Sequence, residues 1–171
     1  NITAFRQAVE NQWSVNLPDF TALHEYSLNE MEKFWLSVRD FCDVRAECWG
    51  DRVLIDSDKM PGAKFFPDAR LNFAENLLRK RDDSPALIFQ AEDQVKRQMS
   101  WSELYDAVSV LAQALTDFGV RPGDRCAGFV PNMPETVVAM LATTSLGAVW
   151  TSCSPDFGVN GVLDRFGQTK P

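Results

Sequence analysis

Residues 125–154 read RCAGFVPNMPETVVAMLATTSLGAVWTSCS, and this stretch decides the fold class. It begins with a short apolar strand pattern. An amphipathic helix is then predicted to start near Asn132, with Pro134 in its first turn, and to run to Gly147. The run 148–154 is apolar to small without alternation, as in a strand covered on both faces of a parallel sheet. The order strand, helix, strand predicts an α/β fold with βαβ crossovers.

The sequence before this stretch predicts a β-hairpin followed by a long helix. Residues 85–91 and 94–101 alternate apolar and polar side chains around the turn-prone EDQ at 92–94, which is typical of paired antiparallel strands. Ser100 is followed three residues later by a glutamate, and this pair forms a capping box. The apolar stripe behind it ends at Gly119, where a helix C-terminus needs a left-handed residue.

The first eighty residues predict helices joined by aromatic-rich loops. Apolar side chains recur every fourth residue from Phe5 to Trp13 and form one helical face. Residues 27–30 read SLNE, a second capping box, and predict the start of the next helix. The segment 51–70 contains two prolines and a glycine and is expected to be a loop, after which Asn72 opens a short helix.

These patterns predict two parts, a helical cap over residues 1–83 and the beginning of an α/β domain over residues 84–171. The final VNGVLDRFG, residues 159–167, predicts a short helix capped by Gly167. In an alternating α/β chain such a helix leads to another parallel strand, and none follows before Pro171. We therefore expect the sequence to be the front part of a larger α/β protein.

Composition narrows the class of partner. Seventeen basic and twenty-four acidic side chains leave a net charge of -7, which argues against binding a nucleic-acid backbone. No run approaches the length of apolar residues that spans a bilayer, and the N-terminus lacks the features of a signal peptide. The sequence thus predicts a cytoplasmic protein without a nucleic-acid or membrane partner.

Familiar chemical motifs are missing. The four cysteines form no C-x-x-C pair, and His24 is the only histidine, so the sequence predicts neither a metal site nor a nucleophile with a histidine base. Neither G-x-G-x-x-G nor G-x-x-x-x-G-K-[ST] occurs. We therefore assign no catalytic residue and no nucleotide-binding motif within these residues.

One corner combines polar, rigid and aromatic residues where open α/β sheets bind ligands, at the carboxyl end of a strand. Asp156 in this corner has two possible roles, contact with a ligand or capping of the helix that begins after Gly158. Both roles remain open from the sequence. The candidate substrate-binding residues are Ser154, Pro155, Asp156 and Phe157.

Residues 99–150 resemble the AMP-forming acyl-CoA synthetases of the adenylate-forming superfamily. The resemblance is carried by SWSEL at 100–104, GVRPGDR at 119–125 and PETVVAMLATTSLGAV at 134–149. Residues 65–79, FFPDARLNFAENLLR, look like the helical N-terminal cap of the acetyl- and acetoacetyl-CoA synthetase branch. The final SPDFGVNGVLDRFGQTKP is similar to the acetoacetyl-CoA synthetases in particular.

The resemblance implies a ligase that uses ATP, Mg²⁺ and coenzyme A to convert acetoacetate to its thioester through an acyl-adenylate. It also implies that the phosphate-binding loop and the catalytic lysine lie beyond Pro171, so these residues alone are expected to be inactive. Asp156 matches a glycine that lies beside the pantetheine tunnel in acetyl-CoA synthetases. There the corner reads closer to Gly-Gly-Phe-Ser, and the change favours a longer, polar 3-oxo acid.

Two alternatives remain beside this interpretation. The enzyme could be a synthetase for acetate or another short-chain acid, and the corner sequence is the feature that discriminates. From a different class, the chain could be a non-catalytic α/β interaction module.

Overall fold

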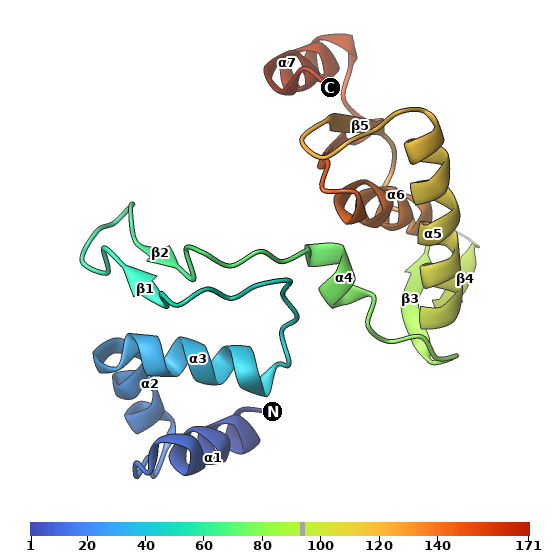
Figure 1. Ribbon diagram of the computed structural model, residues 1–171. Coiled ribbons are helices and arrows are strands. Elements are labelled where there is room, and N and C mark those ends of the chain that lie inside the picture. Colours follow the sequence, from blue (N-terminus) through green and yellow to red (C-terminus); the bar gives the residue numbers. More distant parts are fainter. Residues whose placement is uncertain (93–94) are drawn as a thin grey trace. The chain divides into compact units, whose positions relative to one another are not determined.

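The chain folds into two units, Asn1–Leu71 and Asn72–Pro171, each with an apolar cluster of its own. Figure 1 shows the computed structural model, which describes residues 1–92 and 95–171. The predicted division after residue 83 refers to domains of a larger protein, and it stays a prediction. The α/β class with a helical N-terminal part is confirmed.

Three helices dominate the first unit: α1 (Ile2–Trp13), α2 (Phe20–Asn29) and α3 (Met31–Phe41). The predicted apolar face of α1 is confirmed, because its buried residues are Phe5 and Val9. These side chains belong to a cluster with residues of α2 and of the α1–α2 loop. The buried members of this cluster are Phe5, Val9, Leu17, Leu23 and Tyr26.

The capping box predicted at residues 27–30 is wrong. The helix begins earlier, because the Asp19 carboxylate accepts a hydrogen bond of 2.8 Å from the Ala22 N–H and caps α2. Ser27 lies inside α2, where its hydroxyl donates to the His24 carbonyl oxygen at 2.6 Å. The next helix, α3, starts after Glu30 without a side-chain capping bond.

The predicted loop at 51–70 contains one small strand pair. The strands β1 (Leu54–Ile55) and β2 (Lys64–Phe65) pair antiparallel, and the segment is otherwise irregular. Arg52 and Asp68 form a bidentate ion pair between the two ends of the segment. The expectation of a loop is therefore correct apart from these two short strands.

The second unit begins with α4 (Phe73–Leu77), the hairpin strands β3 (Pro85–Gln90) and β4 (Lys96–Ser100), and α5 (Trp101–Asp117). The Asn72 side chain caps α4 as predicted, by accepting a hydrogen bond from Glu75 N–H at 3.1 Å. The antiparallel pairing of β3 and β4 confirms the predicted hairpin. Of its expected turn, Asp93 and Gln94 lie outside the described residues.

Both predicted ends of α5 are confirmed. The Ser100 hydroxyl accepts a hydrogen bond from the Glu103 N–H at 3.1 Å, and the Glu103 carboxylate accepts one from the Ser100 N–H at 2.7 Å. These bonds satisfy two backbone donors that a helix start leaves without partners. At the other end Gly119 has a φ of +91°, a conformation that glycine adopts without strain.

The decisive stretch forms β5 (Arg125–Phe129), α6 (Pro134–Ser145) and β6 (Val149–Cys153), with β5 and β6 parallel. This confirms the predicted βαβ unit. The helix is slightly shorter than expected, since its N-cap is Met133 rather than Asn132 and it ends before Gly147.

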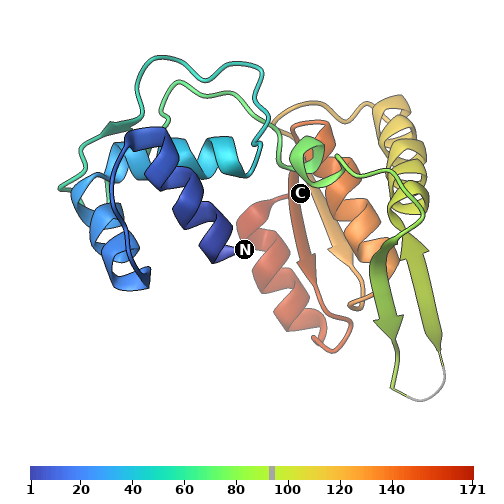
Figure 2. The same ribbon diagram turned by 90° about the horizontal axis from the view of Figure 1, so that it is seen from below.

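The β5–β6 pair lies between α6 and α7 (Val159–Thr169), so helices cover both faces of this sheet (Figures 1 and 2). Coverage is incomplete in both strands, whereas Cys153 at the end of β6 is buried. The exposed residues are Arg125, Ala127 and Phe129 in β5 and Val149 and Ser152 in β6. The hairpin β3–β4 belongs to a separate sheet, so the segment β4–α5–β5 is not a crossover within one sheet.

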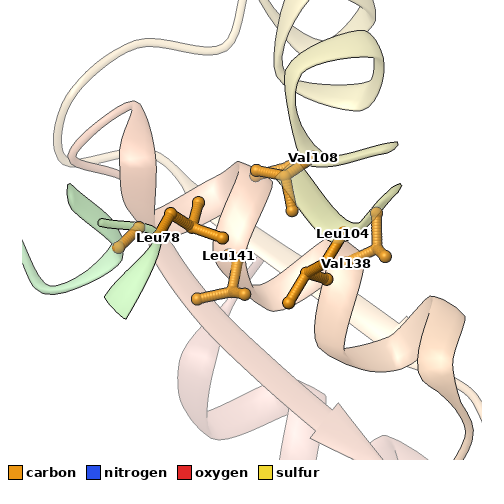
Figure 3. Close-up of a cluster of buried hydrophobic side chains, with 7 residues drawn as sticks. Leu78, Leu104, Val108, Val138 and Leu141 are labelled. Carbon is orange, nitrogen blue, oxygen red and sulfur yellow. The ribbon is translucent and has the colours of Figure 1, made fainter. Parts of the chain in front are cut away.

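A cluster between α4, α5 and α6 forms the core of the second unit (Figure 3). Leu104 and Leu141 are at most 1% exposed, and each contributes about 1.5–3 kcal/mol through removal of apolar surface from water. The Asn72 amide donates to the Thr144 carbonyl oxygen at 2.9 Å and ties the start of α4 to the end of α6. The buried members are Ala74, Leu78, Leu104, Val108, Val138, Leu141 and Ala142.

The predicted C-terminal cap of the last helix is wrong. Gly167 lies inside α7, which continues to Thr169. The residue that turns left-handed is Lys170, with a φ of +49°, and its N–H donates to the Phe166 carbonyl oxygen at 2.7 Å. A backbone hydrogen bond at Lys170 thus ends the helix, although a non-glycine residue in this conformation is less favourable than glycine.

Candidate functional site

The candidate corner leaves the carboxyl edge of the β5–β6 sheet. Ser154 follows β6 directly, and the strand pairing extends one residue past β5, because the Val130 N–H donates to the Cys153 carbonyl oxygen at 3.2 Å. Two loops, 130–133 and 154–158, therefore leave the same edge of the sheet. Ligands of open α/β sheets bind at this edge.

Ser154 and Asp156 are joined by side-chain hydrogen bonds. The Ser154 hydroxyl donates to Asp156 Oδ2 at 2.7 Å and accepts from the Asp156 N–H at 3.4 Å. The Phe157 N–H donates to the Ser154 carbonyl oxygen at 3.1 Å and closes a turn in which Pro155 restricts the backbone. The corner thus holds an exposed carboxylate in a defined orientation.

The structure excludes one of the two roles that the sequence leaves open for Asp156. The N-cap of α7 is Gly158, and no side chain makes the capping bond. Asp156 is therefore not a helix cap in the described chain. Contact with a ligand stays a prediction for Ser154, Pro155, Asp156 and Phe157.

The Phe157 ring packs against α7. The Arg165 guanidinium carbon lies 3.8 Å from the ring centroid, a cation–π distance. Gly161 is the other close neighbour, because a Cβ placed there would lie 3.2 Å from the ring atom Cδ1. Phe157 is 39% exposed as a residue, so it lies at the surface of the described chain rather than in a core.

Gly161 and Arg165 neighbour the Phe157 ring and are not among the candidate residues predicted from the sequence. Gly161 and Arg165 are four residues apart and lie on one face of α7, whereas Phe157 precedes the helix. Their contacts with the Phe157 ring depend on how the chain enters α7 at Gly158, which residue spacing does not show.

The second loop at this edge is fixed by polar contacts at the start of α6. The Thr136 hydroxyl donates to the Pro131 carbonyl oxygen at 2.6 Å. Arg97 of β4 donates two hydrogen bonds of 2.6 and 2.8 Å to the Glu135 carboxylate in the first turn of α6. These hydrogen bonds hold the pKa of Glu135 below its ordinary value.

An apolar cavity of about 150 Å³ lies between β3 and the start of α6. It is smaller than the roughly 300–1,000 Å³ of a typical small-molecule site, so it cannot by itself enclose a nucleotide. Its lining residues are Leu87, Ile88, Phe89, Asn132, Met133, Pro134 and Val137.

Within residues 1–92 and 95–171, no group of three or more His, Cys, Asp or Glu side chains lies together in a way that could hold a metal ion. Among the same residues, every helix is too short or too polar to cross a bilayer.

Two family matches cover most of the chain. The family described as "AMP-binding enzyme" matches residues 73–171, which is more than half of the chain. This chain belongs to the AMP-binding enzyme family. The family described as "Acetyl-coenzyme A synthetase N-terminus" matches residues 20–77. Both matches confirm the resemblance to this superfamily and its acetyl- and acetoacetyl-CoA synthetase branch.

Two named proteins are similar in sequence to most of this chain. The chain is 54% identical over 153 residues to "Acetoacetyl-coenzyme A synthetase" of Rhizobium meliloti (strain 1021), which covers 90% of this chain and 23% of that protein. It is 37% identical over 175 residues to "Malonamoyl-CoA synthetase vrtB" of Penicillium aethiopicum, covering 98% of this chain and 24% of that protein.

A solved AMP-binding enzyme shares the fold over nearly the whole chain. It is "Acetoacetyl-CoA Synthetase from Streptomyces lividans", with a TM-score of 0.92 and 45% sequence identity. The similarity covers 99% of this chain and 27% of that structure. The chain therefore spans about a quarter of the length of the relatives it matches.

Proposed function

We propose that this chain is the N-terminal part of an acetoacetyl-CoA synthetase. The observation that carries the proposal is the similarity in fold and sequence to the acetoacetyl-CoA synthetase of Streptomyces lividans over 99% of the chain. The extended protein, by which we mean this chain continued to the length of its relatives, would perform the reaction. The 171-residue chain contributes scaffold and one edge of the substrate path.

The proposed reaction has two steps. A carboxylate oxygen of acetoacetate attacks the α-phosphorus of ATP, and pyrophosphate leaves. The thiol sulfur of coenzyme A then attacks the acyl carbon of the adenylate, loses its proton, and displaces AMP. Mg²⁺ would reduce the phosphate charge in such a transfer. We assign no Mg²⁺ ligand to this chain, because residues 1–92 and 95–171 bring together no group of three or more His, Cys, Asp or Glu side chains.

The corner supplies the proposed contact with substrate. From the resemblance we propose that Asp156 lies beside the path of the pantetheine arm of coenzyme A. Its carboxylate is exposed and accepts a hydrogen bond from the Ser154 hydroxyl. Pantetheine contains two amide N–H groups, which are suitable donors to a carboxylate. We propose that Ser154, Pro155, Asp156 and Phe157 border the tunnel for coenzyme A and acid.

A second candidate acid is supported by one observation, the 37% identity to a malonamoyl-CoA synthetase over 98% of this chain. Malonamate, like acetoacetate, is a short acid with a polar carbonyl at its third carbon. The 54% identity to the Rhizobium meliloti protein favours acetoacetate over this acid and over acetate. Membership of an enzyme family also favours a ligase over a non-catalytic interaction module.

The cytoplasm is the proposed location of this enzyme. A reducing compartment accords with the four cysteines, none of which forms a disulfide in the structure. Small molecules are the proposed partners, and the net charge of -7 disfavours nucleic acid.

Acid-dependent exchange of labelled pyrophosphate into ATP tests the first step. We expect exchange by the extended protein with acetoacetate and no detectable exchange by the 171-residue chain. Exchange by the short chain alone would show that its residues contain the catalytic site and would contradict the proposal. Absence of exchange by the extended protein with any short acid would contradict the assignment as a ligase.

A further inference from the structure

Two residues on one face of α7 border the Phe157 ring. Phe157 precedes the helix, and Gly161 and Arg165 follow at four-residue intervals. A Cβ at Gly161 would lie 3.2 Å from the ring Cδ1 and 3.4 Å from the Phe157 Cβ, which is tighter than ordinary contact. The Arg165 guanidinium lies 3.8 Å from the ring centroid. The Phe157 ring thus lies against Gly161, which has no side chain, and beside the positive charge of Arg165.

We propose that Gly161 and Arg165 are positioning residues that fix the Phe157 ring for binding of coenzyme A. This inference rests on the proposed function, in which the corner borders the path of the thiol arm. Hydrogen bonds of Ser154 fix the corner backbone and the Asp156 carboxylate, but they do not fix the ring. A partly exposed ring needs its own restraint, and Gly161 and Arg165 provide it.

The two residues act in different ways. Gly161 gives the ring room, since a Cβ there would lie 3.2 Å from the ring Cδ1, so the ring and the helix must separate by a few tenths of an ångström. Arg165 holds the ring by cation–π attraction, and its Nη1 is anchored to the Gly161 carbonyl oxygen at 3.5 Å. Because binding contacts depend steeply on distance, a small shift of the ring weakens contact with a ligand.

Two glycine substitutions in α7 distinguish an effect on the position of the Phe157 ring from an effect on the stability of the helix. Gly161→Ala and Gly167→Ala both replace a helical glycine by the best helix former, so both favour the helix. Only Gly161→Ala crowds Phe157, because a Cβ at Gly167 has no neighbouring atom within 4 Å among the described residues. The experiment compares thioester formation by the two variants of the extended protein.

We expect Gly161→Ala to raise the KM for coenzyme A on the order of threefold relative to Gly167→Ala. The kcat and the KM for ATP should stay within about twofold of wild type, because a shift of the Phe157 ring alters only the binding of coenzyme A. Neither variant should lower the melting temperature. Equal KM values for coenzyme A in the two variants would overturn the inference.

Substitutions of Arg165 test the other restraint. Arg165→Met removes the cation and should raise the KM for coenzyme A about two- to fivefold, whereas Arg165→Lys retains a cation and should restore part of the loss. Arg121→Met, at an exposed arginine of the turn before β5, controls for loss of one positive charge. A similar rise in Arg121→Met, or none in Arg165→Met, would contradict the role of Arg165.

The experiment distinguishes failure of this inference from failure of the proposed function. A wild-type extended protein that forms no thioester with any short acid contradicts the proposed function, and the inference falls with it. An active wild type with unchanged KM values in Gly161→Ala and Arg165→Met contradicts the inference alone. In the 171-residue chain, we also expect the Phe157 ring proton resonances to move in Gly161→Ala and to stay in place in Gly167→Ala.

Discussion

The Arg97 guanidinium of β4 donates two hydrogen bonds to the Glu135 carboxylate of α6, with N–O distances of 2.6 and 2.8 Å. This bidentate pair joins the hairpin sheet to the helix that connects the two parallel strands. It also lies in the first turn of α6, where a carboxylate interacts favourably with the helix dipole. The pair therefore links β4 to the β5–α6–β6 unit, although β4 belongs to a different sheet from β5 and β6.

The stabilisation by this pair should depend on pH. Arg97 holds the pKa of Glu135 below its ordinary value of 4.5 in the folded chain. The stabilisation is therefore fully present above that value and is lost as the pH falls through the lowered folded pKa. We expect Glu135→Gln to lower the melting temperature at neutral pH. The difference in melting temperature from wild type should shrink as the pH falls below 4.5, the ordinary pKa of glutamate.

Thermal unfolding across this pH range measures the effect. Asp106→Asn, at an exposed carboxylate of α5, serves as the control for loss of one negative charge. A pH-independent difference for Glu135→Gln would show that the ion pair does not contribute through ionisation. High salt should also reduce the difference, since both side chains are about half exposed.

The core between α4, α5 and α6 should be sensitive at Leu141. Its side chain is 0% exposed, so Leu141→Ala removes buried methyl groups and leaves a cavity that costs about 2–5 kcal/mol of unfolding free energy. Val110→Ala on the exposed side of α5, where Val110 is 72% exposed, should change it by less than about 0.5 kcal/mol. Urea unfolding followed by circular dichroism checks both values; a small loss for Leu141→Ala would contradict this packing.

Two substitutions test where α2 begins. Asp19→Ala removes the side chain that accepts from the Ala22 N–H, and it should cost about 1 kcal/mol of stability. Ser27→Ala should cost clearly less, because Ser27 lies inside α2 and bonds only to the carbonyl oxygen one turn earlier. The reverse order in urea unfolding would favour the capping box that the sequence suggested.

The polar corner should influence substrate binding through Asp156. Asp156→Ala in the extended protein removes the exposed carboxylate and should raise the KM for coenzyme A or acetoacetate, with the KM for ATP unchanged. Ser154→Ala leaves the carboxylate but removes its hydrogen-bond donor, worth about 0.5–1.5 kcal/mol, and should have a smaller effect. Steady-state kinetics with each substrate varied in turn measures both; unchanged values for Asp156→Ala would remove it from the binding site.

Local signals explain which helices the sequence predicted well. In α5 the capping box, the apolar stripe and the terminal Gly119 all lie within one continuous segment, and all three agree with the structure. In the region of α2 and α3, both Asp19 and Ser27 have side chains that can cap a helix. In the structure Asp19 caps α2, and Ser27 lies inside that helix. A competition of this kind depends on which helix start packs better, which a local pattern does not show.

The candidate site was predictable only in part. The position of the corner followed from the order of strand and helix, since the carboxyl edge of a parallel pair is set by topology. The contacts of Phe157 with Gly161 and Arg165 depend on the rotamers of two side chains and on how the chain enters α7 at Gly158. Neither could be read from spacing alone, so the neighbours of the ring were missed.

The most direct test of the central claim is the ratio of kcat/KM for acetoacetate, malonamate and acetate in thioester formation by the extended protein. Our account predicts that acetoacetate has the highest kcat/KM of the three acids. A higher kcat/KM for malonamate or acetate would contradict it.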